Sequence, residues 1–203
     1  MKGVGVSLNT ANRITLARIA LIPLFMLFFA KWPEWLAESS GLIRFMNDYG
    51  LYIAIVLFVL ASGTDKLDGY IARKYNQVTN LGKLLDPLAD KLLISAALIM
   101  MVQADMIASW VAVIMIGREF VITGLRMIAS AQGIALAADK LGKWKMVLQV
   151  AAIIAVLLSN IPLQWINAIR IDDVLMLLAV CMTLVSGIHY LMKNFKALRL
   201  NDM

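Results

Sequence analysis

Four aspartates stand close together in two neighbouring stretches of the chain, Asp65 with Asp68 and Asp86 with Asp90. If the stretches are helical, Asp65 and Asp68 lie about 60° apart on one face, and the second pair is separated by about one turn. Carboxylates this close repel one another unless they are protonated, paired with Lys or Arg, or neutralised by divalent cations. Hard cations such as Mg²⁺ prefer oxygen ligands, and two of them about 4 Å apart can clamp a phosphoryl group during displacement.

Small residues share the face of each aspartate pair. The small residues Gly69 and Ala72, together with the guanidinium of Arg73, fall on the stripe of the first pair. Gly82 falls on the stripe of the second pair. Missing side chains leave room for a bulky phosphorylated ligand. The alternative is that the acids only solvate the helix ends or pair with neighbouring cations, namely Lys66, Arg73, Lys83 and Lys91.

These residues must be positioned by an unusually apolar chain. Of its 203 residues, 62% are hydrophobic and 16% are charged, and the mean hydropathy is +0.81. A small soluble domain has too little interior to bury so much apolar surface, and a disordered chain is poor in apolar residues. The runs long enough to span a bilayer predict an all-α integral membrane bundle of six transmembrane helices, a single membrane-embedded catalytic domain over 1–203. The predicted spans are 14–30, 49–65, 84–104, 106–130, 144–161 and 173–192.

Basic residues gather in the segments that join these spans on one side, together with both termini. The positive-inside rule therefore predicts a multi-pass protein of the cell membrane with its termini and active site on the cytoplasmic side. The net charge of +6 is attributed to these loops and to anionic lipid rather than to nucleic acid. On the other side, 31–48 is expected to form an aromatic-rich loop at headgroup level.

A second group of charges interrupts the fourth predicted span. Arg118 and Glu119 lie deep in it, and charged groups there usually face a cavity or a partner. Arg126 follows eight residues later, so Arg118 and Arg126 could line one wall of a phosphate pocket that Lys143 and Lys145 close. The alternative is that Arg118 pairs with Glu119 or the aspartates while Arg126 reaches to the membrane surface.

The pattern Asp-x2-Asp-Gly-x2-Ala-Arg-x8-Gly-x3-Asp-x3-Asp over residues 65–90 resembles the signature of the CDP-alcohol phosphatidyltransferase family at every position. The resemblance implies a six-helix membrane fold, transfer of a phosphatidyl or similar group from a CDP-linked donor to an alcohol with release of CMP, and two divalent cations, Mg²⁺ or Mn²⁺. It implies metal ligands at Asp65, Asp68, Asp86 and Asp90, a catalytic base at Asp90, and CDP-binding positions at Gly69, Ala72, Arg73, Gly82, Asp65 and Asp68.

Further motifs are Asn12-x2-Thr15-x2-Arg18, Gly117-Arg118-Glu119, Gly124-Leu125-Arg126 and Gly142-Lys143-x-Lys145. They resemble the phosphatidylglycerophosphate synthase branch of that family, and the resemblance is strongest over 9–160. It implies CDP-diacylglycerol as donor, sn-glycerol 3-phosphate as acceptor, membrane lipid as surroundings and a homodimer through the third and fourth spans. The implied acceptor-binding residues are Arg118, Arg126, Lys143, Lys145, Thr15 and Arg18. One departure is Met146, where the branch often has threonine.

Other functions compete with this interpretation. A relative with serine, inositol or phosphatidylglycerol as acceptor would need fewer cations in its pocket. A divalent-cation transporter would also place acids in a membrane, but the acids here gather at one face and no inverted repeat is visible. An aspartate-rich prenyltransferase has different aspartate spacing, and a membrane scaffold leaves the acidic stripes unexplained.

Overall fold

The computed structural model describes residues 10–74, 80–134, 136, 140–159 and 171–194, and side chains within 15–64, 88–134, 141–158 and 171–194. Every regular element in these residues is an α-helix, which confirms the all-α prediction. The chain divides into two compact units, Met1–Met100 and Met101–Met203, which are described separately below. The single domain over 1–203 stays a prediction.

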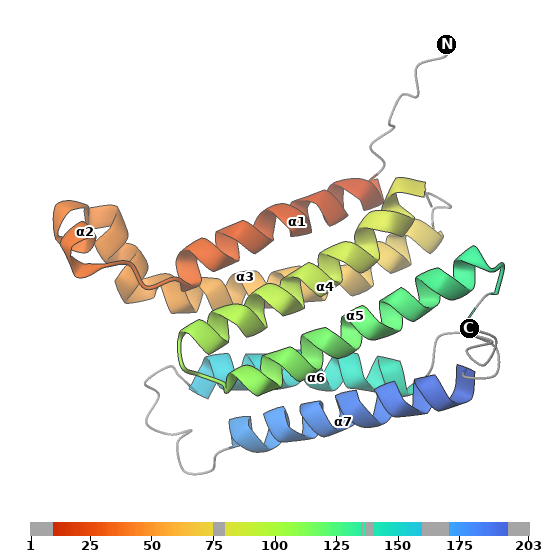
Figure 1. Ribbon diagram of the computed structural model, residues 1–203. Helices are drawn as coiled ribbons and strands as arrows, with labels where there is room; N and C mark the ends of the chain where they lie inside the picture. Colours follow the sequence, from red (N-terminus) through yellow and green to blue (C-terminus); the bar gives the residue numbers. More distant parts are fainter. Residues whose placement is uncertain (1–9, 75–79, 135, 137–139, 160–170, 195–203) are drawn as a thin grey trace. The chain divides into compact units, whose positions relative to one another are not determined.

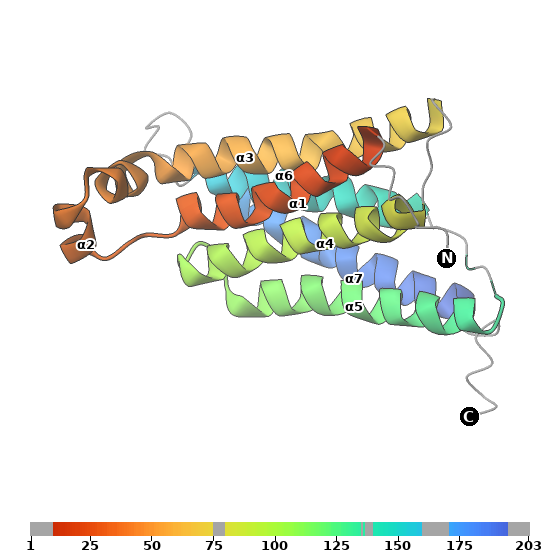
Figure 2. The same ribbon diagram turned by 90° about the horizontal axis from the view of Figure 1, so that it is seen from above.

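The first unit contains α1 (Thr10–Phe29), α2 (Glu34–Ser39), α3 (Gly41–Lys74) and most of α4 (Asn80–Gln103). Helix α1 packs along α3, and α4 runs in the opposite direction to α3 (Figures 1 and 2). Phe25 of α1 and Phe58 of α3 are fully buried, with ring centroids 6.0 Å apart. The two helices come close enough at Gly50 that a Cβ there would collide with the main-chain oxygen of Phe28. Glycine at this position therefore sets the close approach of α1 to α3.

The connection between α1 and α3 is more ordered than a simple loop. The Asn47 side chain accepts a hydrogen bond from the Trp32 amide and donates one to the Trp32 carbonyl, both at 2.9 Å. These two hydrogen bonds hold the residues that precede α2 against the first turns of α3. The predicted loop over 31–48 is therefore wrong in detail, because α2 and the start of α3 lie within it. Trp35 of α2 is nevertheless 70% exposed, as expected for a side chain at headgroup level.

The second unit contains α5 (Ser109–Ala131), α6 (Lys140–Ser159) and α7 (Ile171–Asn194). Helix α7 packs against both α5 and α6, running in the same direction as α5 and opposite to α6 (Figure 1). The interior between them is apolar and includes the fully buried side chains of Met115, Ile153 and Leu157. Because lipid is as apolar as this interior, close van der Waals packing rather than removal of side chains from water holds the three helices together in a membrane. This core fixes the polar side chains described below.

Each of the six predicted spans falls on its own helix, α1, α3, α4, α5, α6 or α7. Three helical stretches in the described residues are long and apolar enough to cross a membrane, and Thr15–Phe29 is a shorter apolar one. The three are Gly41–Thr64, Leu141–Leu158 and Ile171–Asn194. Helix α5 is of sufficient length but carries Arg118, Glu119 and Arg126 in its interior. Six membrane crossings therefore remain a prediction, while the apolar helices are consistent with a multi-pass membrane protein.

Candidate active site

The acidic residues lie on the helices that their spacing predicts. Helix α3 continues beyond its apolar part, through Asp65 and Asp68 to Lys74. Helix α4 begins at Asn80 and therefore includes Gly82, Asp86 and Asp90. The backbone thus places the two acidic stripes on helices that run in opposite directions (Figure 2). Both aspartate pairs therefore stand on helices, as their spacing assumes, and the metal site itself stays a prediction.

The side chains of the acidic stripes are only partly described. Asp90 is half-buried on α4, next to the fully buried Ala89. The other predicted residues of the metal and CDP sites have side chains outside the described ones. They are Asp65, Asp68, Gly69, Ala72, Arg73, Gly82 and Asp86. Among the side chains that are described, no group of three acids, histidines or cysteines meets around a common point. The convergence of all four aspartates stays a prediction, while their carboxylate chemistry fits hard divalent cations.

Two of the residues predicted to bind the acceptor substrate lie on α1, beside the start of the acidic stripe. Thr15 and Arg18 are each 1% exposed, and Nε of Arg18 donates to Oγ1 of Thr64 at 3.5 Å. Thr64 immediately precedes Asp65 on α3. Arg18 is therefore held at the end of the apolar part of α3, one position before the acidic stripe begins.

Arg118, Glu119, Lys145 and Ser186, here called the basic cluster, meet from three helices of the second unit. Nη1 of Arg118 donates to Oε1 of Glu119 at 3.1 Å, and Nη2 donates to Oγ of Ser186 at 3.1 Å. Nζ of Lys145 donates to the same oxygen of Glu119. One carboxylate therefore binds two cations, and the cluster keeps a net positive charge. The ion pair between Arg118 and Glu119, one of the alternatives for Arg118, is thus present.

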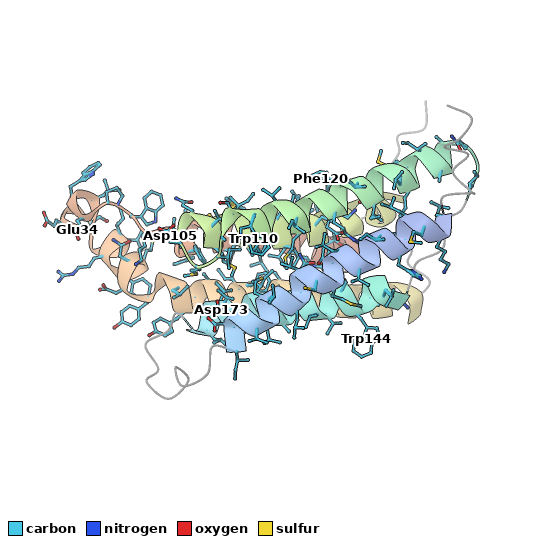
Figure 3. All side chains as sticks on the ribbon, turned by 60° about the horizontal axis from the view of Figure 1, so that its bottom comes forward. Glu34, Asp105, Trp110, Phe120, Trp144 and Asp173 are labelled. Atoms are coloured by element: carbon cyan, nitrogen blue, oxygen red, sulfur yellow. The ribbon has the colours of Figure 1, made fainter. Side chains whose placement is uncertain are left out.

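The orientation of the cluster follows from the helical period. Phe120 and Trp144, the chain neighbours of Glu119 and Lys145, are 72% and 69% exposed and point away from the helices (Figure 3). Because successive residues differ by about 100° around a helix, the adjacent charged side chains turn inward. Lys145 is only 4% exposed. Apolar side chains thus face the surroundings while charged ones face the interior, as expected for a functional site in a membrane protein.

Arg126 lies two turns further along α5 and contacts a different residue of α7. Its Nε donates to the phenolic oxygen of Tyr190 at 3.1 Å, and its guanidinium carbon lies 5.2 Å from the centre of the Tyr190 ring. Arg126 is exposed, whereas Tyr190 is 2% exposed. Lys143, the remaining predicted cation, is exposed at the start of α6. The structure therefore brings Arg118 and Lys145 together and places Arg126 and Lys143 outside that contact.

Helix α7 supplies contacts that the sequence analysis did not predict. Thr183, Ser186, Gly187 and Tyr190 are all buried and fall within about 100° of arc on one face of the helix. A Cβ on Gly187 would lie 3.2 Å from Cγ of Arg118, so this glycine leaves room for the arginine stem. The three-and-four spacing of small and polar types within an apolar span is the signal that could have identified this face.

A separate cavity lies at the opposite end of the second unit from the basic cluster. Its volume is about 320 Å³, and its lining includes Trp110, Asp173 and Met176, two of which are labelled in Figure 3. The remaining lining residues are Met106, Ile107, Ala108, Val111, Val156, Leu177 and Val180. The cavity is mostly apolar and none of the predicted site residues lines it, so it is not the pocket that the charged residues indicate.

Comparison with known proteins relates this arrangement to characterised sequences. The chain is 44% identical over 198 residues to the CDP-diacylglycerol–glycerol-3-phosphate 3-phosphatidyltransferase of Bacillus subtilis, covering 96% of this chain and 99% of that protein. Proteins with the same name in Rickettsia bellii and Haemophilus influenzae are each 35% identical, covering 90% and 88% of this chain and 93% and 89% of their own lengths. The profile described as CDP-alcohol phosphatidyltransferase matches residues 8–185, which include both acidic stripes and Arg118, Glu119 and Lys145 of the basic cluster. The chain belongs to the CDP-alcohol phosphatidyltransferase family and is a transferase.

Proposed function

We propose that this transferase moves a phosphatidyl group from CDP-diacylglycerol to sn-glycerol 3-phosphate, giving phosphatidylglycerophosphate and CMP. The relatives carry this activity in their names over nearly the whole length of the chain. The observation that carries the choice of acceptor is the basic cluster, in which Arg118 and Lys145 share the single carboxylate of Glu119. The net positive charge that remains inside the helix bundle is costly unless an anionic ligand balances it, and a phosphorylated acceptor is such a ligand.

The acidic stripes account for the donor end of the reaction. Asp65, Asp68, Asp86 and Asp90 supply carboxylate oxygens that would hold two Mg²⁺ or Mn²⁺ ions. When bound, such cations offset the charge of the diphosphate and of the departing CMP. Gly69, Ala72, Arg73 and Gly82 would surround the CDP moiety, with the small residues giving it access to the helix backbone.

Asp90 is proposed as the base. An alcohol is a weak nucleophile at neutral pH, so a positioned carboxylate that accepts its proton lowers the barrier to attack. The acceptor oxygen then forms a bond to the phosphorus that carries diacylglycerol, and the bond from that phosphorus to the CMP oxygen breaks. Half-burial of Asp90 on α4 is compatible with this role, because the carboxylate keeps access to a substrate entering from the membrane surface.

The membrane arrangement is part of the same proposal. We infer six spans in the cell membrane with the basic ends, both termini and the active site on the cytoplasmic side. Within the second unit, Asp105 and Asp173 lie near the starts of α5 and α7, while Lys193 lies at the end of α7, as a positive-inside arrangement requires. A homodimer through α4 and α5 is proposed from small residues of α5, the exposed Gly117 and the half-buried Gly124, where an added Cβ would meet nothing within 4 Å and another helix could approach closely.

The experiment that tests the function uses purified protein in detergent with CDP-diacylglycerol and Mg²⁺ or Mn²⁺. Glycerol 3-phosphate, serine, inositol and phosphatidylglycerol are offered separately, and CMP release and lipid product are measured. We expect product with glycerol 3-phosphate alone, loss of activity in EDTA, and recovery on addition of metal. Product with a different acceptor, or full activity in EDTA, would contradict the proposal.

A further inference from the structure

We propose that Tyr190 is a positioning residue that orients Arg126 to bind the phosphate of the acceptor. This rests on the proposed function, because it assigns a further residue to that same acceptor pocket. The family signature and the basic motifs of α5 and α6 do not include Tyr190, which stands near the end of an apolar span.

The two arginines of α5 differ in which edge of the guanidinium is occupied. Arg118 uses both terminal amino groups, Nη1 on Glu119 and Nη2 on Ser186. Its Nε is buried and has no hydrogen-bond partner among the described residues. Both terminal amino groups of Arg118 are therefore already held by the protein, and each has one N–H left over.

Arg126 has the opposite arrangement. Its Nε binds Tyr190, and neither terminal amino group has a partner within the part of the chain that the structure describes. The edge formed by Nη1 and Nη2 is the one that binds two oxygens of a phosphate side by side. Because Arg126 is exposed, this edge is accessible to a substrate. Arg126 is thus the arginine of the pair that is prepared to receive a phosphate.

Tyr190 restricts Arg126 in two ways. The hydroxyl fixes the Nε edge at 3.1 Å, and the ring lies 5.2 Å from the guanidinium carbon, within cation–π range. Tyr190 itself is 2% exposed and therefore held by the packing of α7. A flexible arginine loses side-chain entropy when it binds a ligand, so prior restraint by a rigid neighbour improves affinity.

The test compares Tyr190→Phe, which removes the hydroxyl and keeps the ring, with Tyr190→Leu, which removes both. Tyr190→Phe is expected to raise KM for glycerol 3-phosphate about tenfold, the effect of one lost hydrogen bond to a charged group. KM for CDP-diacylglycerol and kcat should stay within about twofold of the wild type, since the donor end is untouched. Tyr190→Leu should raise the acceptor KM further because the ring contact is also lost.

The matched control is Thr183→Val, which deletes another buried hydroxyl from the same face of α7. Thr183 donates a hydrogen bond to the carbonyl of Ala179 within its own helix and contacts no cation among the described residues. We expect its kinetics to equal those of the wild type. If Thr183→Val raises the acceptor KM as much as Tyr190→Phe does, the effect belongs to helix packing and the proposal is wrong.

A double-mutant cycle with Arg126→Gln separates positioning from a general structural role. If Tyr190 acts through Arg126, Tyr190→Phe should add nothing to the acceptor KM of Arg126→Gln. Additive effects would overturn the proposal, as would an unchanged KM in Tyr190→Phe. Wild-type activity with glycerol 3-phosphate tests the proposed function separately. An active wild type with an unaffected Arg126→Gln variant would remove Arg126 and Tyr190 from the pocket while leaving the function intact.

Discussion

Gly187 of α7 lies directly against Arg118 of α5, and a Cβ on Gly187 would be 3.2 Å from Cγ and 3.7 Å from Nε of Arg118. Cγ is near the root of the arginine side chain, so the stem must shift by a few tenths of an ångström if Gly187 becomes alanine. Gly187→Ala should therefore weaken the hydrogen bonds of the guanidinium to Ser186 and Glu119. We expect kcat/KM for glycerol 3-phosphate to fall about tenfold, measured by CMP release.

The control for that change is Gly41→Ala at the start of α3, where an added Cβ meets nothing within 4 Å. Its kinetics should match those of the wild type. A Gly187→Ala enzyme with normal acceptor kinetics would show that the position of Arg118 does not matter for the reaction.

Asp90→Asn tests the proposed base. The amide cannot accept the proton of the attacking hydroxyl, and general-base catalysis typically contributes about 10²–10⁴-fold to rate. We expect kcat to fall by roughly this factor while CDP-diacylglycerol binding, measured by equilibrium titration, is largely kept. Asp105→Asn is the matched change, because Asp105 is an exposed aspartate with φ of 55°, a conformation that asparagine adopts readily. Turnover by Asp90→Asn at the wild-type rate would exclude Asp90 as the base.

Glu119→Gln tests whether the shared carboxylate stabilises the fold. Two partly buried cations would lose their common anion, and a lost hydrogen bond to a charged group costs about 2 kcal/mol. For a chain of this length such a loss lowers Tm by about 5 °C, which thermal unfolding in detergent can measure. Combining Glu119→Gln with Lys145→Met should restore part of the loss, because one unpaired cation is removed with its partner.

Glu34→Gln, at the exposed first turn of α2, is the corresponding control and should leave Tm unchanged. A Glu119→Gln protein as stable as the wild type would show that the cluster contributes nothing to folding.

Gly50→Ala tests the close approach of α1 to α3. Alanine favours a helix over glycine by about 1 kcal/mol, but overpacking typically costs about 1–3 kcal/mol. Because the added carbon would meet the main-chain oxygen of Phe28, which cannot rotate away, the steric cost should prevail and Tm should fall. Gly63→Ala on the same helix meets nothing within 4 Å and should keep or raise Tm. A rise in Tm for both variants would mean that α1 and α3 separate at no cost.

The helices were predictable because apolar run length and membrane thickness constrain one another. The segment 31–48 was not, since the short α2 and the start of α3 depend on contacts such as the Asn47–Trp32 pair, which no local pattern reveals. The charged residues of α5 could be identified from the sequence because they interrupt an apolar span. The direction in which each guanidinium points could not be predicted from them. Ser186 and Tyr190 lie 68 and 64 positions from their arginine partners, so their contribution required the packing of α7.

Helix α3 changes from apolar to acidic between two consecutive residues, which affects how the lipid donor reaches the site. Its apolar part ends at Thr64, and the next residue, Asp65, opens the acidic stripe without any intervening turn. The 24 residues of that part extend about 36 Å, more than the roughly 30 Å of a hydrocarbon core. In the six-span arrangement proposed above, the acidic stripe would begin where acyl chains give way to water. A lipid would then present its diphosphate there with its tails still dissolved among its neighbours, and no extraction step would have to precede the chemistry.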